Sequence, residues 1–300
     1  MRVVESVSIV TVPFDGGGSR RGASQGPEAI IQAGLERKLM NLGLAATVEE
    51  PVGPLELKDM GNIPELKYLN EVAGINEMLA GRVASIAGGS SFPLVLGGDH
   101  SIAIGTLAGL AQHYNQLGVI WIDAHSDMNT PETTPSGNIH GMSLAVSLGQ
   151  GVEKLTSIGG SAAKIRPRNV VIIGARQLDP GEREYIRKEG ITCFTMTDID
   201  KLGMPRVMEE AIRVASEGTD GVHVSFDIDS VDPNIAPGTG TPVQGGLSYR
   251  EAHLAMEMLY ESGIVTSAEF VEVSPTLDQG HRTSRLVVEL IGSLLGERIL

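Results

Sequence analysis

Three side chains that favour metal ions follow one apolar strand at every second position, and this pattern constrains the chain more than any other. Asp123, His125 and Asp127 come directly after the apolar run Val119–Ile122. In an extended backbone, side chains two residues apart point the same way. Carboxylates and an imidazole crowded on one side of a strand end repel one another, or stay unsatisfied, unless a cation lies among them. The pattern predicts a divalent-metal site; the alternative is a polar strand exit that caps the next element.

Two further strand ends carry residues of the same kind. His100 follows an apolar run and two glycines in the segment Gly97–Ser101, and Asp227 and Asp229 lie two apart at the end of another run. Open α/β sheets collect their functional groups beyond the carboxyl ends of the strands. His100 alone would more often be a structural residue at a turn. Because candidate metal ligands occur at three strand ends, one shared site is favoured.

The number and charge of these candidate ligands indicate two metal ions. Six side chains exceed the needs of one ion. Their four carboxylates carry about −4, which two divalent ions would balance, and a site with two ions about 3.5–4 Å apart requires carboxylates that can bridge. Oxygen-rich ligation with one imidazole per ion favours Mn²⁺ over Zn²⁺, while iron, cobalt and nickel stay open.

The apolar pattern predicts one α/β domain that covers residues 1–300. Strands and helices alternate from end to end, so we expect a largely parallel sheet of about eight strands with helices on both faces, in three layers. The expected strands are residues 7–12, 46–49, 92–96, 119–122, 170–173, 191–195, 222–229 and 264–273. The expected helices begin at Pro27 and cover 66–87, 102–114, 206–216, 248–261 and 283–295, with one more between the fifth and sixth strands.

Charge and composition limit the class of partner and the location. A net charge of −14 argues against nucleic acid and against anionic membrane surfaces. No apolar run approaches ~18 residues and no cleavage-site pattern follows the first strand, so we expect a chain that is neither secreted nor membrane-spanning. The single Cys193 cannot form an internal disulfide, and we expect a small buried apolar residue in a reducing, cytoplasmic compartment.

Several other polar residues have plainer interpretations. The three glycines at 16–18 suggest a phosphate loop, but neither phosphate-loop pattern follows, so phosphate binding is disfavoured. Arg20 and Arg21 are expected to form salt bridges or part of an interface. Asp99 and Asp232 are expected to support turns or ligands. The remaining histidines lack chelating neighbours and are expected to be structural or exposed; they are His113, His223, His253 and His281.

Three motifs resemble the signatures of the ureohydrolase superfamily, which includes arginases and agmatinases. They are Gly97–Ser101, Asp123–Asp127 and Ser225–Pro233. The resemblance covers nearly the whole chain, from Val12–Asp15 to Glu272–Pro275. Within the superfamily, the loop Asn129–Gly141 resembles arginases, since agmatinases lack its Asn…Ser-Gly-Asn arrangement and have no substrate carboxylate to hold. The resemblance implies an arginase/deacetylase-like fold.

The resemblance also implies a binuclear manganese hydrolase. His100 and Asp127 would hold one Mn²⁺ and His125 and Asp229 the other, with two bridging residues, Asp123 and Asp227, shared by both ions. A hydroxide that bridges the ions would attack the guanidinium carbon of L-arginine and give L-ornithine and urea. Two cations lower the pKa of their shared water toward neutrality, which makes that hydroxide available.

Further roles follow from the same resemblance. Asp127 would carry the hydroxide proton to the leaving amine, and His140 would shuttle protons to solvent because its unperturbed pKa lies near ~6.5. Glu272 would pair with the guanidinium group, and the Thr241 hydroxyl would lie near the same end of the substrate.

The amino-acid end of the substrate would be held by polar side chains of two loops. Neutral donors to the α-carboxylate would be Asn129, Ser136 and Asn138, and partners of the α-ammonium group would be Asp179 and Glu182. The segment Asp179–Glu182 can equally be a plain helix N-terminus. Gln177 departs from vertebrate arginases, which carry an acidic residue at that place, and the loss of one carboxylate could weaken arginine binding.

Two other functions stay open on the sequence alone. The chain could be an agmatinase or another guanidino-acid hydrolase, or a non-catalytic metal-binding relative that kept the fold. The second alternative is disfavoured because His140 and Glu272 are present beside all six candidate ligands. The resemblance also implies a homo-oligomer, either a trimer or a hexamer, that acts on a small-molecule substrate.

Overall fold

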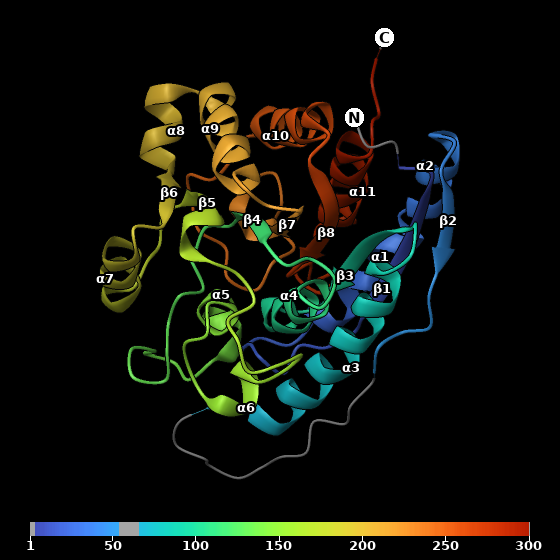
Figure 1. The fold of residues 1–300 in the computed structure, drawn as a ribbon. Helices are drawn as coiled ribbons and strands as arrows, with labels where there is room; N and C mark the ends of the chain where they lie inside the picture. The colour runs from blue at the N-terminus through green and yellow to red at the C-terminus, as the bar shows by residue number, and fades with distance from the viewer. Residues whose placement is uncertain (1–3, 54–65, 300) are drawn as a thin grey trace.

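The centre of the molecule is an eight-stranded sheet in which all strands run parallel (Figure 1). The computed structural model describes residues 4–53 and 66–299, and the strand order is β2-β1-β3-β8-β7-β4-β5-β6. The strands are β1 (Ser6–Val12), β2 (Ala45–Val48), β3 (Phe92–Gly97), β4 (Leu117–Ile122), β5 (Val170–Ala175), β6 (Thr192–Thr195), β7 (Gly221–Asp227) and β8 (Val265–Val271). The predicted parallel sheet is confirmed.

Helices cover both faces of the sheet and produce the three predicted layers (Figure 1). They are α1 (Gly26–Gln32), α2 (Leu35–Asn41), α3 (Leu69–Ala87), α4 (Ala103–Leu110), α5 (Ser143–Ser147), α6 (Glu153–Thr156), α7 (Pro180–Glu189), α8 (Met196–Leu202), α9 (Met204–Ser216), α10 (Tyr249–Ser262) and α11 (Arg282–Leu294). Residues of α1, α2 and α8–α11 pack in one hydrophobic cluster, and residues of α3–α7 pack in a second. Strand β4 contributes to both clusters, with Ile120 and Ile122 in the first and Val119 and Trp121 in the second.

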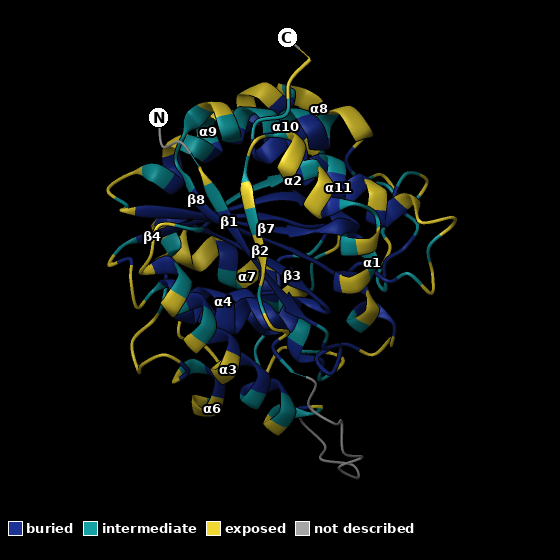
Figure 2. Cartoon of the chain, turned by 90° about the vertical axis from the view of Figure 1, so that its right-hand side faces the viewer, coloured by how far each residue is buried: buried dark blue, intermediate teal, exposed yellow. Residues whose placement is uncertain are grey.

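The central strands are buried along their whole length. Every residue of β3, β4, β5 and β7 is buried. Parallel strands that are covered on both faces have no polar alternation, which is why β3, β4 and β5 are apolar runs in the sequence. Strand β7 differs, because it carries the buried polar residues His223, Ser225 and Asp227. Figure 2 shows the buried sheet inside a shell of exposed helix surfaces, with the edge strand β2 largely exposed. Among the described residues, no helix is both long and apolar enough to cross a membrane.

Several predicted helix boundaries are wrong, and the backbone conformation explains them. The sequence predicts one helix from Pro27 on, but Gly34 has a φ of 104° and divides it into α1 and α2. The helix predicted from Leu66 begins only after Tyr68, whose φ of 53° is left-handed. The predicted helix 102–114 is the short 3-10 helix η2 (His100–Ile102) followed by α4, which ends at Leu110.

Three short helices were not predicted, namely α5, α6 and α8. The start of α8 carries a readable signal, because the side chains of Thr195 and Asp198 form a capping box at its first turn. Cys193 on β6 is only partly buried, so the prediction of a buried apolar residue is wrong in its degree of burial.

The turn between β3 and η2 holds His100 in place through tight backbone packing. A Cβ atom at Gly98 would overlap the carbonyl oxygen of Phe14, so only glycine fits this close approach. Asp99 begins η2: its Oδ1 accepts the backbone N–H of Ser101 at 2.9 Å, and its Oδ2 accepts that of Gly17 at 2.7 Å. The glycine-rich loop therefore closes around a protein carboxylate, in line with the sequence argument against a phosphate loop.

Replacement of Gly98 tests this packing. We expect Gly98→Ala to lower the free energy of unfolding by about 1–3 kcal/mol, because the backbone around Phe14 must shift to admit the new methyl group. The matched control is Gly81→Ala inside α3, where nothing beyond the adjacent residues and the backbone of the same helix lies within 4 Å of the new Cβ; this variant should gain up to ~1 kcal/mol from helix propensity. Urea unfolding of the three proteins measures both changes, and equal stability of the two variants would contradict the packing argument.

Candidate metal centre

The segment Asp123–Asp127 curls at the end of β4 instead of continuing the strand. The prediction of an extended backbone is therefore wrong: β4 ends at Ile122 and the chain bends through residues 123–125. The Asp123 N–H donates to the carbonyl oxygen of Ile173 at 3.0 Å, and Asp123 Oδ1 accepts the N–H of His125 at 2.7 Å. Asp127 then takes a φ of 50°. The side chains converge because the backbone turns, and strand alternation is not the cause.

The second aspartate pair is also split between two elements. Asp227 is the last residue of β7, while Asp229 lies in the short 3-10 helix η5 (Ile228–Ser230). The predicted strand 222–229 is therefore two residues too long. Asp227 Oδ1 accepts the backbone N–H of Asp229 at 2.8 Å and so caps the turn that aims Asp229 at the cluster.

All six candidate ligands meet at this edge of the sheet. His100 Nδ1 lies 3.2 Å from Asp123 Oδ2, 3.1 Å from Asp127 Oδ2 and 3.2 Å from Asp227 Oδ2. His125 Nδ1 lies 3.4 Å from Asp123 Oδ1 and 3.1 Å from Asp229 Oδ2. Two sets of side chains lie close enough together to hold a metal ion: His100, Asp123 and Asp227, and Asp123, His125 and Asp229. Asp123 belongs to both sets, with Oδ2 facing His100 and Oδ1 facing His125.

The environment of His100 indicates that a cation belongs in the cluster. Its Nδ1 is buried and makes no hydrogen bond within the described part of the chain, although three carboxylate oxygens surround it. The ring stacks on Trp121 with centroids 4.0 Å apart and planes 6° apart, and Trp121 Nε1 donates to Asp123 Oδ2 at 3.0 Å. A fixed ring that aims an unpaired nitrogen at carboxylates matches the way a divalent ion is held.

The shifted pKa values of the cluster also indicate that it binds a cation. Burial raises the pKa of Asp127 to about 7, and the charge of Asp123 adds to this shift. Burial also raises the pKa of Asp227 well above its ordinary value, with the charges of Asp229 and Asp123 adding to the effect. Burial alone would lower the pKa of His100, but the surrounding carboxylates hold it well above its ordinary value. Without a metal ion the cluster therefore gathers protons, because it needs positive charge.

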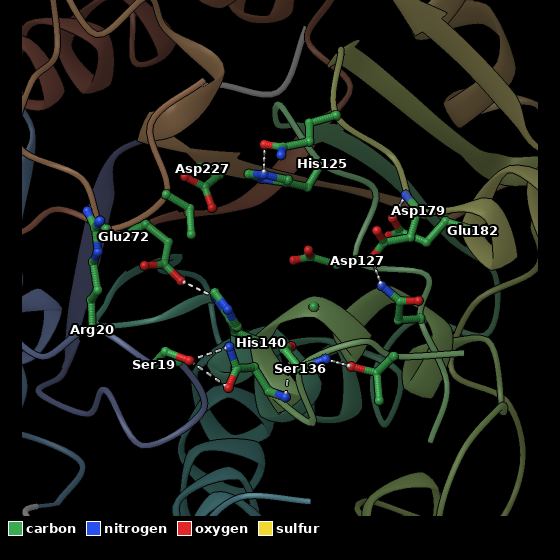
Figure 3. Close-up of a pocket in the computed structure, with 18 of the residues that line it drawn as sticks. Ser19, Arg20, His125, Asp127, Ser136, His140, Asp179, Glu182, Asp227 and Glu272 are labelled. Carbon is green, nitrogen blue, oxygen red and sulfur yellow. Dashed lines mark hydrogen bonds and ion pairs between the residues drawn. The ribbon is translucent and has the colours of Figure 1, made fainter. Parts of the chain in front are cut away.

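A cavity of about 530 Å³ opens beside the cluster (Figure 3). Every residue predicted to bind substrate or move protons lines it, together with several others; the predicted residues are Asp127, Asn129, Ser136, Asn138, His140, Asp179, Glu182, Thr241 and Glu272. In Figure 3, Glu272 and Arg20 lie on one side of the cavity, and Asp179 and Glu182 lie on the opposite side. The cavity volume is suited to a small molecule.

Glu272 is held at the buried end of the cavity in a strained conformation. It follows the last residue of β8 and has a φ of 64°, a value that is uncommon outside glycine. The predicted strand to residue 273 is thus too long by two residues. Glu272 Oε1 accepts the N–H of His100 at 2.9 Å and lies 2.9 Å from His140 Nδ1. Burial lowers the pKa of His140, but the bond to Glu272 outweighs this and raises the pKa to about 9.

The start of α7 is a helix N-terminus, as one of the two interpretations of Asp179–Glu182 predicted, and it also lines the cavity. Asp179 is the N-cap of α7 and forms a capping box with Glu182, whose Oε2 accepts the Asp179 N–H at 2.7 Å. Glu182 Oε1 accepts the Ser126 hydroxyl at 2.7 Å and the Met128 N–H at 3.1 Å. Both oxygens of Glu182 thus hold protein groups, while Asp179 Oδ2 accepts the Asn129 amide at 2.9 Å.

Thr241 and Gln177, which the sequence analysis singled out, contact the cluster directly. Thr241 donates its hydroxyl to Asp229 Oδ2 at 3.0 Å. Gln177, the departure from vertebrate arginases, lies with its Oε1 3.3 Å from Nε2 of His125. An amide at this place therefore contacts a candidate ligand while it also lines the cavity.

The structure adds pocket and support residues that the sequence argument did not assign. Asn138 Oδ1 accepts the Lys67 ammonium at 2.8 Å and the Ser19 hydroxyl at 3.0 Å, so both groups lie at the rim. Arg20 lines the cavity, whereas Arg21 pairs with Asp15 as a salt bridge at 3.4 Å. No spacing pattern marks Lys67 or Ser19, since they come from segments far from Asn138 in the chain.

The histidines set aside in the sequence have structural contacts where they are buried. His223 Nδ1 lies 2.9 Å from the Ser267 hydroxyl, and His253 Nδ1 lies 2.9 Å from the Ser293 hydroxyl. Asp232 accepts the N–H groups of Asn234 at 3.0 Å and of Gly245 at 2.9 Å, as expected for a turn residue.

Comparisons with known proteins were made with the whole chain. The family model described as the arginase family matches residues 5–296. The arginase of Bacillus subtilis strain 168 is 56% identical over 298 residues, which is 99% of each chain. The solved arginase of Bacillus caldovelox has a TM-score of 0.96 at 53% identity, and the match covers 99% of this chain and all of that one. An arginase of Entamoeba histolytica, solved in complex with L-ornithine, has a TM-score of 0.92 at 34% identity with the same coverage.

The protonation of the cluster predicts how metal binding depends on pH. A metal ion binds the deprotonated carboxylates, so protons compete with it below the pKa of Asp127, about 7. We expect Mn²⁺ affinity to be higher at pH 8 than at pH 6. Well below the pKa of Asp127 the affinity should rise about tenfold per pH unit for the one proton displaced, and the rise should level off above that pKa. Equilibrium dialysis with elemental analysis measures the affinity, and calorimetry in buffers of different ionisation enthalpy measures the protons released. Equal affinity at both pH values would contradict the prediction.

Proposed function

Because the chain belongs to the arginase family of hydrolases, we propose that it hydrolyses L-arginine to L-ornithine and urea. The observation that carries the proposal is the change of side-chain chemistry along the cavity. It runs from a buried cluster of carboxylates and imidazoles to a set of amides and hydroxyls, in which Asn129 and Asn138 are buried and Ser136 is exposed. A guanidinium group suits the first end and an amino-acid head group suits the second. The Entamoeba histolytica relative, solved with L-ornithine, supports the choice of product.

The proposed cofactor is a pair of Mn²⁺ ions. One ion is held by His100 and Asp127 and the other by His125 and Asp229, with Asp123 and Asp227 shared. Support for sharing is clearest at Asp123, whose Oδ2 faces His100 and whose Oδ1 faces His125. Oxygen-rich ligation with one imidazole per ion favours manganese. When bound, the two ions supply Lewis acidity that lowers the pKa of water toward neutrality.

Glu272 is proposed to orient the guanidinium group. In the described part of the chain its side-chain hydrogen bonds end on Oε1, so Oε2 is free to face the substrate. A buried carboxylate that pairs with a planar guanidinium is geometrically selective. The Thr241 hydroxyl lies at the same end, held by Asp229.

Two residues are proposed to move protons. Asp127 lines the cavity beside the cluster, where a carboxylate can accept a proton and return it to the leaving amine, which needs one. His140 lies between the buried cluster and the outside, with about a sixth of its side chain exposed, so its imidazole can exchange protons with solvent. Its pKa of about 9, above the ordinary value assumed from the sequence, makes the ring a proton donor at neutral pH. Its bond to Glu272 keeps the ring oriented.

The rim is proposed to bind the amino-acid end of arginine. Neutral donors for the α-carboxylate are Asn129, Ser136 and Asn138. Asp179 supplies negative charge for the α-ammonium group, and Glu182 supports it, because both Glu182 oxygens hold the surrounding backbone and Ser126. The cytoplasmic location and the trimeric or hexameric assembly stay predictions.

Removal of one rim donor should distinguish arginine from agmatine, which lacks the α-carboxylate. We expect Ser136→Ala to lower kcat/KM for L-arginine about 10- to 100-fold, the effect of one lost hydrogen bond to a charged group, and to leave the low rate with agmatine unchanged. The matched control is Thr130→Ala, which removes an exposed hydroxyl of the same loop that bonds to Glu132. Urea release measures each rate, and faster release from agmatine than from arginine in the unchanged protein would favour an agmatinase instead.

Replacement of the proposed proton carrier tests the catalytic proposal. We expect Asp127→Asn to lower kcat by at least ~100-fold, because an amide cannot accept and return the proton. Elemental analysis of the variant separates loss of metal from loss of proton transfer. Two bound ions together with unchanged turnover would contradict the role of Asp127 and would favour a metal-binding relative in which the cluster is not catalytic.

A further inference from the structure

A lysine outside the cavity contacts one of the side chains that are proposed to bind the substrate carboxylate. Lys67 precedes α3 and is exposed, and it is not among the residues that line the cavity. Its Nζ lies 2.8 Å from Oδ1 of Asn138, which does line the cavity. The backbone N–H of Lys67 also donates to the carbonyl oxygen of Gly137 at 3.1 Å. Two hydrogen bonds therefore join this segment to the loop that carries Asn138.

Lys67 decides the orientation of the Asn138 amide. An ammonium group donates hydrogen bonds and accepts none, so the amide atom 2.8 Å from Nζ must be the oxygen. The Ser19 hydroxyl cannot make this distinction, because it lies 3.0 Å from Oδ1 and 2.7 Å from Nδ2 and a hydroxyl can either donate or accept. Without the ammonium group of Lys67, the two orientations of the amide would differ little in their hydrogen bonds.

With its oxygen held by Lys67, the Asn138 amide is left as a donor for a ligand. In the part of the chain that the structure describes, the Ser19 hydroxyl is the protein partner of Nδ2, which carries two hydrogens. Figure 3 shows Ser19 and Ser136 on the same side of the cavity as His140. A carboxylate bound there can accept the remaining N–H. The reversed amide would present its oxygen, which repels a carboxylate.

We propose that Lys67 is a positioning residue that fixes the Asn138 amide as a hydrogen-bond donor, and so makes the cavity selective for substrates that carry a carboxylate. The inference rests on the proposed function, because it requires that Asn138 meets the α-carboxylate of L-arginine. Lys67 does not line the cavity and acts through Asn138. The reacting groups lie at the buried cluster, whereas Lys67 is exposed, so its loss should change KM and leave kcat unchanged.

The test compares ligands with and without the carboxylate. We expect Lys67→Met to raise KM for L-arginine about tenfold, the effect of one weakened hydrogen bond to a charged group, and to leave kcat and the low rate with agmatine unchanged. Lys67→Arg, whose guanidinium also only donates, should restore most of the preference. Calorimetry gives the same comparison without turnover: affinity for L-ornithine should fall about tenfold, and affinity for 1,4-diaminobutane, which lacks the carboxylate, should not change.

A matched control and a double variant separate this role from a general effect on the protein. Lys154→Met removes another exposed ammonium group that bonds to an asparagine Oδ1, that of Asn70 in α3, and neither residue lines the cavity. This variant should keep the kinetic constants of the unchanged protein. In an Asn138→Ala background, Lys67→Met should change KM for L-arginine by less than about twofold, because the side chain through which Lys67 acts is gone.

An unchanged preference for L-arginine over agmatine in Lys67→Met would overturn the inference, as would a full tenfold loss in the Asn138→Ala background or an equal loss in Lys154→Met. Circular dichroism shows whether each variant folds; if Lys67→Met does not, Lys67→Ala, which removes the ammonium group without adding apolar surface, decides in its place. Failure of the proposed function is a separate result, because then the unchanged protein itself would release urea no faster from L-arginine than from agmatine.

Discussion

Mutual repulsion among four buried carboxylates is the constraint on which the rest of the structure depends. Asp123, Asp127 and Asp227 all lie within 3.2 Å of one imidazole nitrogen. Burial raises the pKa of Asp127 to about 7 and the pKa of Asp227 well above its ordinary value. A protein keeps such a group only if a cation offsets the charge. The surrounding network holds the side chains in place against this repulsion, so that the cation meets an arrangement that already exists.

The parallel sheet is what brings these side chains together. The carboxyl ends of β3, β4, β7 and β8 lie next to one another in the order of the strands, and each strand stops where its functional residue begins. Close backbone contact at Gly98 and the left-handed conformations of Asp127 and Glu272 then turn the side chains inward. Strain of this kind persists only where neighbouring contacts enforce it. Here the apolar strands, buried on both faces, form the rigid base.

The fold class and the six-residue cluster could be predicted from the sequence, because apolar runs and strand ends are local signals. The geometry of the cluster could not: the every-second-residue spacing of Asp123, His125 and Asp127 suggested an extended strand, whereas β4 has already ended at Ile122. Helix α8 was missed although its capping residues are visible in the sequence. Lys67 and Ser19 reach Asn138 from distant segments, so no pattern within one segment could have revealed them.

The two halves of the cluster differ in what lies behind each histidine, and this difference has a physical consequence. Behind His100 stand a buried hydroxyl on β7 and a buried carboxylate on β8; behind His125 stands a neutral amide at the edge of the cavity. An acidic residue in place of Gln177 would add a further negative charge to a region that already holds Asp179 and Glu182. The amide keeps an acceptor for His125 without that added repulsion. Gln177 therefore contacts a candidate metal ligand and lines the cavity with the same side chain.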